Sequence, residues 1–140
     1  MVSYVKYEPA IESLTNKLLD LFGTTDTIKL ALGRDTDAPN ASTDDELADQ
    51  TQPTGTGYTA GGDDTQNDST RSGGTVTETA VDHTWTAGAA DWQSFRYGVR
   101  QDDTSITDRL LNYWDYGSTV NLGNAETFQA DYGASVATYA

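Results

Sequence analysis

The sequence predicts a mainly β protein: an antiparallel β-sandwich or jelly-roll-like domain with one N-terminal amphipathic helix and long acidic loops. Three observations lead to this prediction. A single segment has apolar residues at helical spacing, six or seven short segments alternate with a period of two, and clusters of Gly, Asn and Asp separate those segments. No pattern of helices between parallel strands is evident. A length of 140 residues suits one domain, 1–140.

The helix is expected over residues 9–22. Pro9 stands where a first-turn proline is tolerated, and Glu8 and Glu12 lie near the positive end of the helix dipole. Gly23 is a natural C-terminal stop. The apolar stripe, with Phe22 beside it, consists of Ile11, Leu14, Leu18 and Leu21. This stripe either covers the protein's own sheet or docks onto a partner.

After the helix, the apolar period changes to two, which is typical of half-buried strands. Within residues 95–100, the alternation places Phe95, Tyr97 and Val99 on one face, and Arg96, Gly98 and Arg100 on the other. The last seven residues, ASVATYA, are a candidate edge strand. The other expected strands are Thr27–Leu32, Thr75–Thr86, Phe95–Arg100, Leu110–Tyr116, Thr119–Leu122 and Thr127–Tyr132.

Two stretches, residues 34–57 and 59–74, are rich in turn-forming residues and poor in apolar ones, so we expect long loops there. Residues 35–82 contain eleven acids and one base, Arg71. Loops of this length in a compact domain are usually functional or mobile. They are either arms that become ordered against neighbouring subunits or solvated surface.

The charge distribution excludes two classes of partner. The chain has 22 acids against 8 bases, for a net charge of -14, and no lysine follows Lys29. Residues 1–34 hold four acids and four bases, so residues 35–140 carry the whole imbalance. Such a surface repels nucleic acid and anionic membranes, which bind clustered Lys and Arg. Because molar salt shortens the Debye length to roughly 3 Å, the composition favours a halophilic protein over an acidic protein of ordinary salt.

The residues that usually carry catalysis are sparse, so an enzyme is not expected. The absence of cysteine excludes disulfides, thiolate metal sites and a cysteine nucleophile. His83 is the single histidine and is interpreted as structural, and no phosphate-binding or dinucleotide-binding glycine pattern is present. No cofactor is expected. A calcium or magnesium site is the one alternative, because hard cations prefer oxygen ligands, and its candidate ligands are Asp63, Asp64, Asn67 and Asp68.

A group of large aromatic residues falls in the C-terminal half: Trp85, Trp92, Tyr113, Trp114 and Tyr116. If buried, they form the core that a small sandwich needs, which is the favoured interpretation. If exposed together, they offer flat rings on which sugars stack. The sequence also shows no signal peptide and no apolar run long enough to span a membrane, so we expect synthesis and folding in the cytoplasm.

Several ordered elements resemble a family of small structural proteins of tailed viruses. The elements are an aromatic and arginine-containing segment at Phe95–Val99, a W-D-Y-G element at Trp114–Gly117 and a final hairpin with the step Glu126–Phe128. The opening VKYEP, the TIKLAL strand and the GYTAGG element at Gly57–Gly62 resemble the family as well. Together with the acidic composition, the resemblance implies a tailed virus of a halophilic archaeon.

The resemblance implies a virion structural protein, of the capsid decoration or cement type, assembled in the host cytoplasm. Its partners would be the major capsid protein, other virion proteins and further copies of itself in a dimer or trimer. The charge-neutral N-terminal segment is the expected partner interface, through Tyr4, Tyr7, Ile11, Leu14, Leu18 and Phe22. The alternative is a fibre, turret or tail accessory component that binds host glycans or another receptor.

Overall fold

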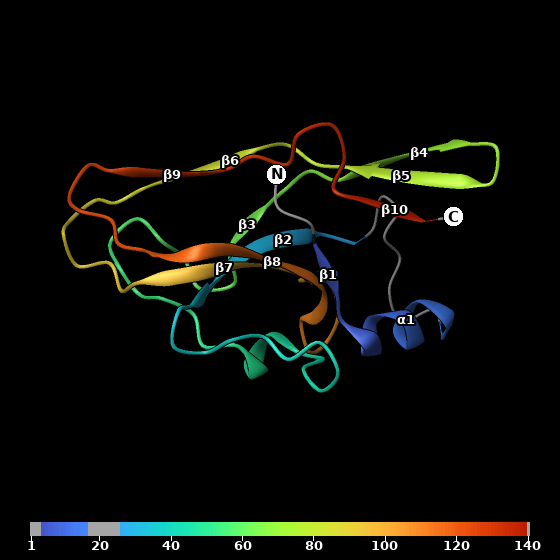
Figure 1. Ribbon diagram of the computed structural model, residues 1–140, viewed down its shortest axis with the longest axis horizontal. Coiled ribbons are helices and arrows are strands. Elements are labelled where there is room, and N and C mark those ends of the chain that lie inside the picture. The colour runs from blue at the N-terminus through green and yellow to red at the C-terminus, as the bar shows by residue number, and fades with distance from the viewer. Residues whose placement is uncertain (1–3, 17–25, 140) are drawn as a thin grey trace.

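The structure is a computed structural model that describes residues 4–16 and 26–139 (Figure 1). Its largest unit is a five-stranded antiparallel sheet with the order β1-β8-β7-β2-β3. A three-stranded sheet, β10-β5-β4, and a two-stranded sheet, β6-β9, lie over the same face of it, so the architecture is sandwich-like (Figure 1). The strands are β1 (Val5–Lys6), β2 (Ile28–Arg34), β3 (Asp63–Asp64), β4 (Asp68–Ser72), β5 (Thr75–Thr79), β6 (His83–Thr86), β7 (Phe95–Asp102), β8 (Arg109–Val120), β9 (Thr127–Ala130) and β10 (Ala137–Tyr139).

The prediction of a mainly β fold with one short N-terminal helix is confirmed. The helix α1 (Glu8–Thr15) begins where the acidic and proline signals place it, and residues 17–22 of the expected helix lie outside the described residues. A short 3-10 helix, η1 (Leu47–Asp49), lies within the first acidic loop. The candidate edge strand at the C-terminus is β10, which pairs with β5.

Three predicted boundaries are wrong. The expected strand Thr75–Thr86 is two strands, β5 and β6, which belong to different sheets. The expected strands Leu110–Tyr116 and Thr119–Leu122 are one strand, β8, which continues through Gly117 at φ +91°. Part of the acidic segment 59–74 forms the strands β3 and β4, which its own residue pattern does not predict. These strands form because β2 and β5 supply partners for their backbone hydrogen bonds.

The apolar core has two parts, one on each face of the five-stranded sheet. Alternation along β2 directs Leu30 and Leu32 between the layers and Ala31 to the opposite face. The core between the layers consists of Leu30, Leu32, Trp85, Ala87, Trp92, Phe95, Tyr132 and Val136. The core on the opposite face consists of Tyr7, Ala10, Ala31, Leu47, Tyr97, Val99 and Leu110. Each fully buried Leu or Phe contributes about 1.5–3 kcal/mol.

Candidate binding site: an aromatic hollow between the layers

A half-open hollow of about 530 Å³ lies between the five-stranded sheet and β9. Its size lies within the roughly 300–1,000 Å³ range of ligand-binding pockets. Most of its lining is apolar or aromatic, and the polar groups are few. The lining residues are Leu30, Leu32, Phe95, Arg96, Tyr97, Gly98, Trp114, Tyr116, Phe128, Gln129, Ala130, Asp131 and Tyr132.

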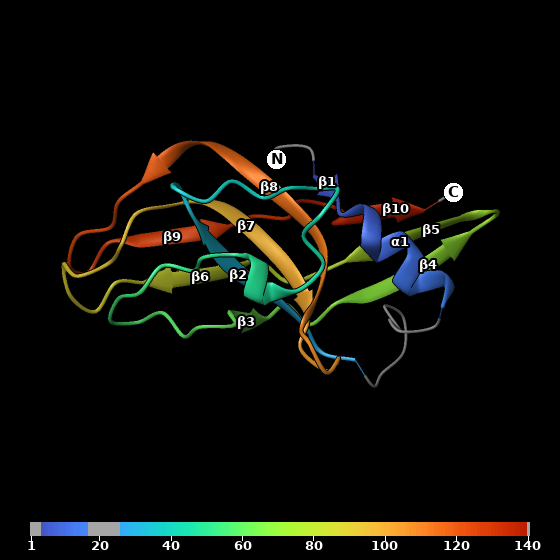
Figure 2. The same cartoon turned by 90° about the horizontal axis from the view of Figure 1, so that it is seen from below.

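The hollow exists because the two layers differ in width. The lower sheet has five strands, whereas the part of the second layer formed by β6 and β9 has two. Within the described residues, β9 pairs only with β6, so its other edge carries no strand. In the view of Figure 2, β9 lies on the side of β6 that is nearer to β8. Within the described residues, no strand pairs with the outer edge of β9. The outer half of β8, which lies on that side, is therefore not covered by a further strand of the second layer.

Two aromatic pairs connect β8 to the β9 segment across the hollow. The ring centroids of Trp114 and Tyr132 are 5.5 Å apart, and those of Tyr116 and Phe128 are 5.6 Å apart. Tyr116 keeps 55% of its surface exposed despite this contact. Two buried donors, Trp114 Nε1 and Tyr132 Oη, have no hydrogen-bond partner among the described residues. Buried polar groups are normally bonded, so these two mark a place where the chain alone leaves its polar groups unsatisfied.

Gly98 in β7 forms part of the lining of the hollow. A methyl group at this position would meet Leu30 Cδ1 at 3.4 Å and Trp114 Cε3 at 3.9 Å, which are ordinary van der Waals contacts. The position therefore does not require glycine for steric reasons. Glycine within a strand weakens it and often marks a close approach of a ligand or another backbone.

One ion pair and one further acid give the hollow its charge. Arg96 donates two hydrogen bonds to Asp115, from Nε at 2.7 Å and from Nη2 at 2.8 Å. The Arg96 hydrogen bond lowers the pKa of Asp115, and the same bond raises the pKa of Arg96. Asp131 also lines the hollow and has no ion pair among the described residues. The charge left over at this site is negative.

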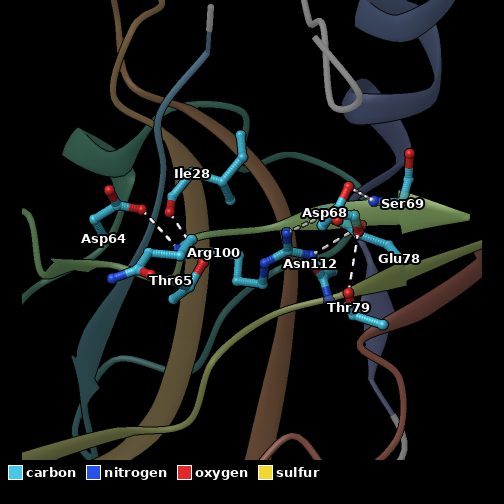
Figure 3. Close-up of polar contacts among 10 residues, drawn as sticks. Ile28, Asp64, Thr65, Asp68, Ser69, Glu78, Thr79, Arg100 and Asn112 are labelled. Carbon is cyan, nitrogen blue, oxygen red and sulfur yellow. Dashed lines mark hydrogen bonds and ion pairs between the residues drawn. The ribbon is translucent and has the colours of Figure 1, made fainter. Parts of the chain in front are cut away.

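The other end of the sandwich is closed by a buried ion pair. Arg100 of β7 reaches across to Glu78 of β5, with Nη1 at 3.3 Å from Glu78 Oε2 and an additional contact from Nη2 to Oε1 (Figure 3). Arg100 Nη1 also lies 3.3 Å from Asn112 Oδ1. Both charged residues are 0% exposed. This cluster connects the five-stranded sheet to β5 and leaves no opening to solvent, so it is a structural clamp.

The four candidate cation ligands are spread along β3, the following turn and β4. Asp63 accepts hydrogen bonds from Trp85 Nε1 at 2.7 Å and pairs with His83 Nε2 at 3.2 Å. Asp64 accepts from the Gln66 backbone, and Asp68 accepts from the backbone of the residue that follows it (Figure 3). Asn67 lies between these two strands. Within the part of the chain that the structure describes, no three acidic or histidine side chains are placed to hold a metal ion.

The candidate interface residues at the N-terminus differ in where the structure places them. Tyr7 is 0% exposed and packs in the protein's own core, so it does not form part of the surface of this chain. Ile11 is 52% exposed, and Tyr4 is half-buried. Leu14 lies in α1. Leu18 and Phe22 lie outside the described residues. The face of α1 that packs on the sheet includes Ala10 and the buried Ser13, whereas Ile11 of the predicted stripe points to solvent.

The predicted aromatic group also divides. Trp85 and Trp92 are buried in the core between the layers. Trp114 and Tyr116 line the hollow, whereas Tyr113 points to the opposite face and packs against Tyr7. Sequence reasoning missed Phe128, Tyr132 and Gly98, which complete the hollow. The available signal was the alternation in Thr127–Tyr132, which places Phe128, Ala130 and Tyr132 on one face.

No helix among the described residues is long and apolar enough to cross a membrane. In the comparisons with known proteins, no family model, no curated protein and no solved structure matches this chain.

Proposed function

We propose that this protein is a virion structural component of the capsid decoration or cement type, which binds the outside of a shell of major capsid protein and stabilises it. The proposal depends on the resemblance in sequence, and one observation of the structure supports it. The three segments that carry the C-terminal resemblance, Phe95–Val99, Trp114–Gly117 and Glu126–Phe128, meet at one place. Each of them contributes residues to the lining of the hollow.

A decoration protein acts by adding buried interface to neighbouring capsid subunits, without covalent chemistry. Repetition of one modest contact over a symmetric shell, and avidity within an oligomer, multiply its effect. From the net charge of -14 we infer a solvent of high ionic strength, where screening removes long-range attraction. Apolar contact and short-range hydrogen bonds must then hold the interface, and the hollow offers both.

The experiment uses shells of the major capsid protein that lack this chain. Purified protein is added in molar KCl, and its co-sedimentation with the shells and the melting temperature of the shells are measured. We expect saturable binding and a higher melting temperature. Protein that stays in the supernatant at all concentrations contradicts the proposal, as does its absence from purified particles by mass spectrometry.

The contribution of the N-terminal segment to shell binding should be tested with a substitution, not with a deletion. Removal of residues 1–22 would also remove Tyr7 and Ala10 from the core, so loss of binding would only report unfolding. Ile11→Asp changes an exposed side chain and tests the docking prediction directly. Weaker co-sedimentation of this variant supports the N-terminal interface, and unchanged co-sedimentation contradicts it.

The second candidate is a fibre, turret or tail accessory component that binds host glycans. It is favoured by the same hollow, because Trp114, Tyr116 and Phe128 offer ring faces there. Glycan arrays at high salt separate the two candidates. Glycan binding that is lost in Trp114→Ala and Tyr116→Ala, but kept in Tyr113→Ala on the opposite face of β8, supports the second candidate.

A further inference from the structure

We propose that the outer edge of β9 receives an extended segment of the major capsid protein as an added strand, with one of its apolar side chains seated in the hollow. The inference rests on the proposed function and names the contact through which it is carried out. Strand addition to an exposed edge is an established mode of peptide recognition, in which main-chain hydrogen bonds give affinity and pockets for alternate side chains give specificity.

The ladder between β6 and β9 shows which backbone groups are free to pair. His83 lies opposite Ala130, and Trp85 lies opposite Phe128. The carbonyl of Glu126 accepts from Ala87, and the amide of Tyr132 donates to Asp82, so even-numbered residues of this segment direct their backbone groups toward β6. In an antiparallel ladder these groups alternate in direction. The N–H and C=O of Gln129 therefore face the outer edge, where no described strand pairs with them.

An added strand at this edge lies where the second layer is incomplete. It would cover the outer half of β8, including the exposed ring of Tyr116, and would extend the two-stranded sheet to three strands. Isolated two-stranded ribbons are marginal, and three strands with an apolar face are the smallest independently stable sheet. An unprotected edge of this kind is otherwise a template for unwanted pairing.

The side chains of the added strand point alternately into the hollow and away from it. A volume of 530 Å³ with a glycine in its lining accommodates a large apolar side chain. The charge at the site selects the rest of the segment. Arg96 is already paired with Asp115, whereas Asp131 has no ion pair among the described residues. The segment should therefore carry Lys or Arg near Asp131 and no acid.

The charge also argues against a second copy of this chain as the occupant. A second copy docked edge to edge would bring its own Asp131 to the same hollow. Like charges across an interface are unfavourable, and complementary ones set the choice of partner. A partner segment with the opposite charge avoids this repulsion.

The test compares two proline variants of the same two-stranded sheet in the shell-binding assay. Gln129→Pro removes the outward N–H of β9. Thr84→Pro is the matched control, because Thr84 is the register partner of Gln129 and its backbone faces the opposite edge. Proline is tolerated at strand edges whose N–H faces solvent, so both variants should fold. We expect shell binding about tenfold or more weaker for Gln129→Pro and within about twofold of wild type for Thr84→Pro.

Hydrogen exchange of the unmodified chain gives a readout that does not depend on the folding of a variant. On addition of shells, the amide of Gln129 should become protected, while the amide of Thr84 should exchange at its former rate. Overlapping peptides of the capsid protein then identify the segment, and Gly98→Leu, which fills the hollow, should weaken its binding about tenfold.

The outcomes separate the inference from the function. If wild type binds shells but both proline variants bind equally and Gln129 stays unprotected, strand addition is wrong and the decoration function stands. If wild type does not bind shells, the function fails and the inference fails with it. Binding of a glycan in the hollow with no capsid peptide bound there also overturns the inference.

Discussion

Strand β7 runs through two regions of the sandwich, and an arginine of this strand has different surroundings in each. Arg100 and Arg96 lie four residues apart on the face that looks toward the second layer. Arg100 crosses the gap to Glu78, and both are 0% exposed. Arg96 instead pairs with Asp115 of the neighbouring strand in its own sheet, and the two side chains are 35% and 40% exposed. One arginine joins the layers, and the other lies along the wall of a hollow.

The difference shows how one fold separates stability from binding. At the closed end, the charges of Arg100 and Glu78 have been removed from water and attract each other, while Arg100 Nε has no hydrogen-bond partner among the described residues. At the open end, the ion pair stays partly hydrated, and the gap between the layers is left unfilled by side chains. Substitutions at the two ends should therefore differ in their cost to stability.

The largest effect is expected for Glu78→Ala at the closed end. This substitution leaves Arg100 buried without its partner, and breaking a buried pair in this way costs about 3–5 kcal/mol. Denaturant unfolding in molar KCl measures the change. The double variant Glu78→Leu with Arg100→Met removes both charges and should recover most of the stability. Equal losses for the single and double variants would show that packing, and not the unpaired charge, sets the cost.

The second-largest effect is expected for Asp102→Asn. Asp102 is the last residue of β7 and is 1% exposed. Burial, with a smaller contribution from the charge of Asp26, raises the pKa of Asp102 to about 6. Because its pKa is higher in the folded state, its stabilising contribution is complete below about pH 4 and is lost as the pH rises through about 6. The unfolding free energy of wild type should therefore fall relative to that of Asp102→Asn over this range.

Asp115 is the matched control, because its pKa is shifted in the opposite direction. Its pKa is lowered by Arg96, so its contribution is present above the ordinary pKa of an aspartate and is lost as the pH falls through its lowered value. Parallel pH profiles for wild type and Asp102→Asn would contradict the assignment of a raised pKa to Asp102.

Replacing either of two glycines by alanine should change the stability by a smaller amount, and in opposite directions. At Gly98 in the hollow, alanine makes only ordinary contacts, and it should stabilise the protein by about 0.4–1 kcal/mol because it restricts the unfolded chain. At Gly62, φ is +78° and a methyl group would lie 1.9 Å from the Leu30 carbonyl oxygen, so alanine should destabilise by more than about 1 kcal/mol. Thermal unfolding of both variants tests the contrast, and a loss of stability in Gly98→Ala would show that the hollow is tighter than described.

The smallest effect is expected for Arg96→Met at the open end. Because this ion pair is partly exposed and screened by salt, its removal should cost about 0–1 kcal/mol. The cost should shrink further as KCl is raised, as measured by denaturant unfolding. A loss as large as that of Glu78→Ala would remove the distinction between the two ends.

Alternation in the sequence predicted part of this arrangement. It placed Arg96, Gly98 and Arg100 on one face of β7, and these residues do face the second layer. It placed Phe95 on the face of Tyr97 and Val99, which is wrong, because a register shift between Phe95 and Tyr97 turns Phe95 into the core between the layers. A β-bulge changes the facing of a side chain without any local signal in the residue pattern.

The hollow itself could not be predicted from the sequence. It arises from the number of strands in each layer, and that number depends on pairings between distant segments, such as β6 with β9 and β2 with β7. The clamp between Glu78 and Arg100 was missed for the same reason, since 22 residues separate them. Charge composition described the surface but did not indicate which acid would be buried.

Native-state hydrogen exchange of the free chain tests the contrast between the two ends most directly. The amides of Val99 and Arg100, both 0% exposed and toward the closed end of β7, should exchange only through global unfolding, because the strands on either side of them are firmly paired. The amides of Phe128 and Ala130 in β9 should exchange through local opening, with markedly lower protection at the same pH and salt. Equal protection of both groups would contradict the account, because it would mean that the sheet over the hollow is as firmly held as the clamp.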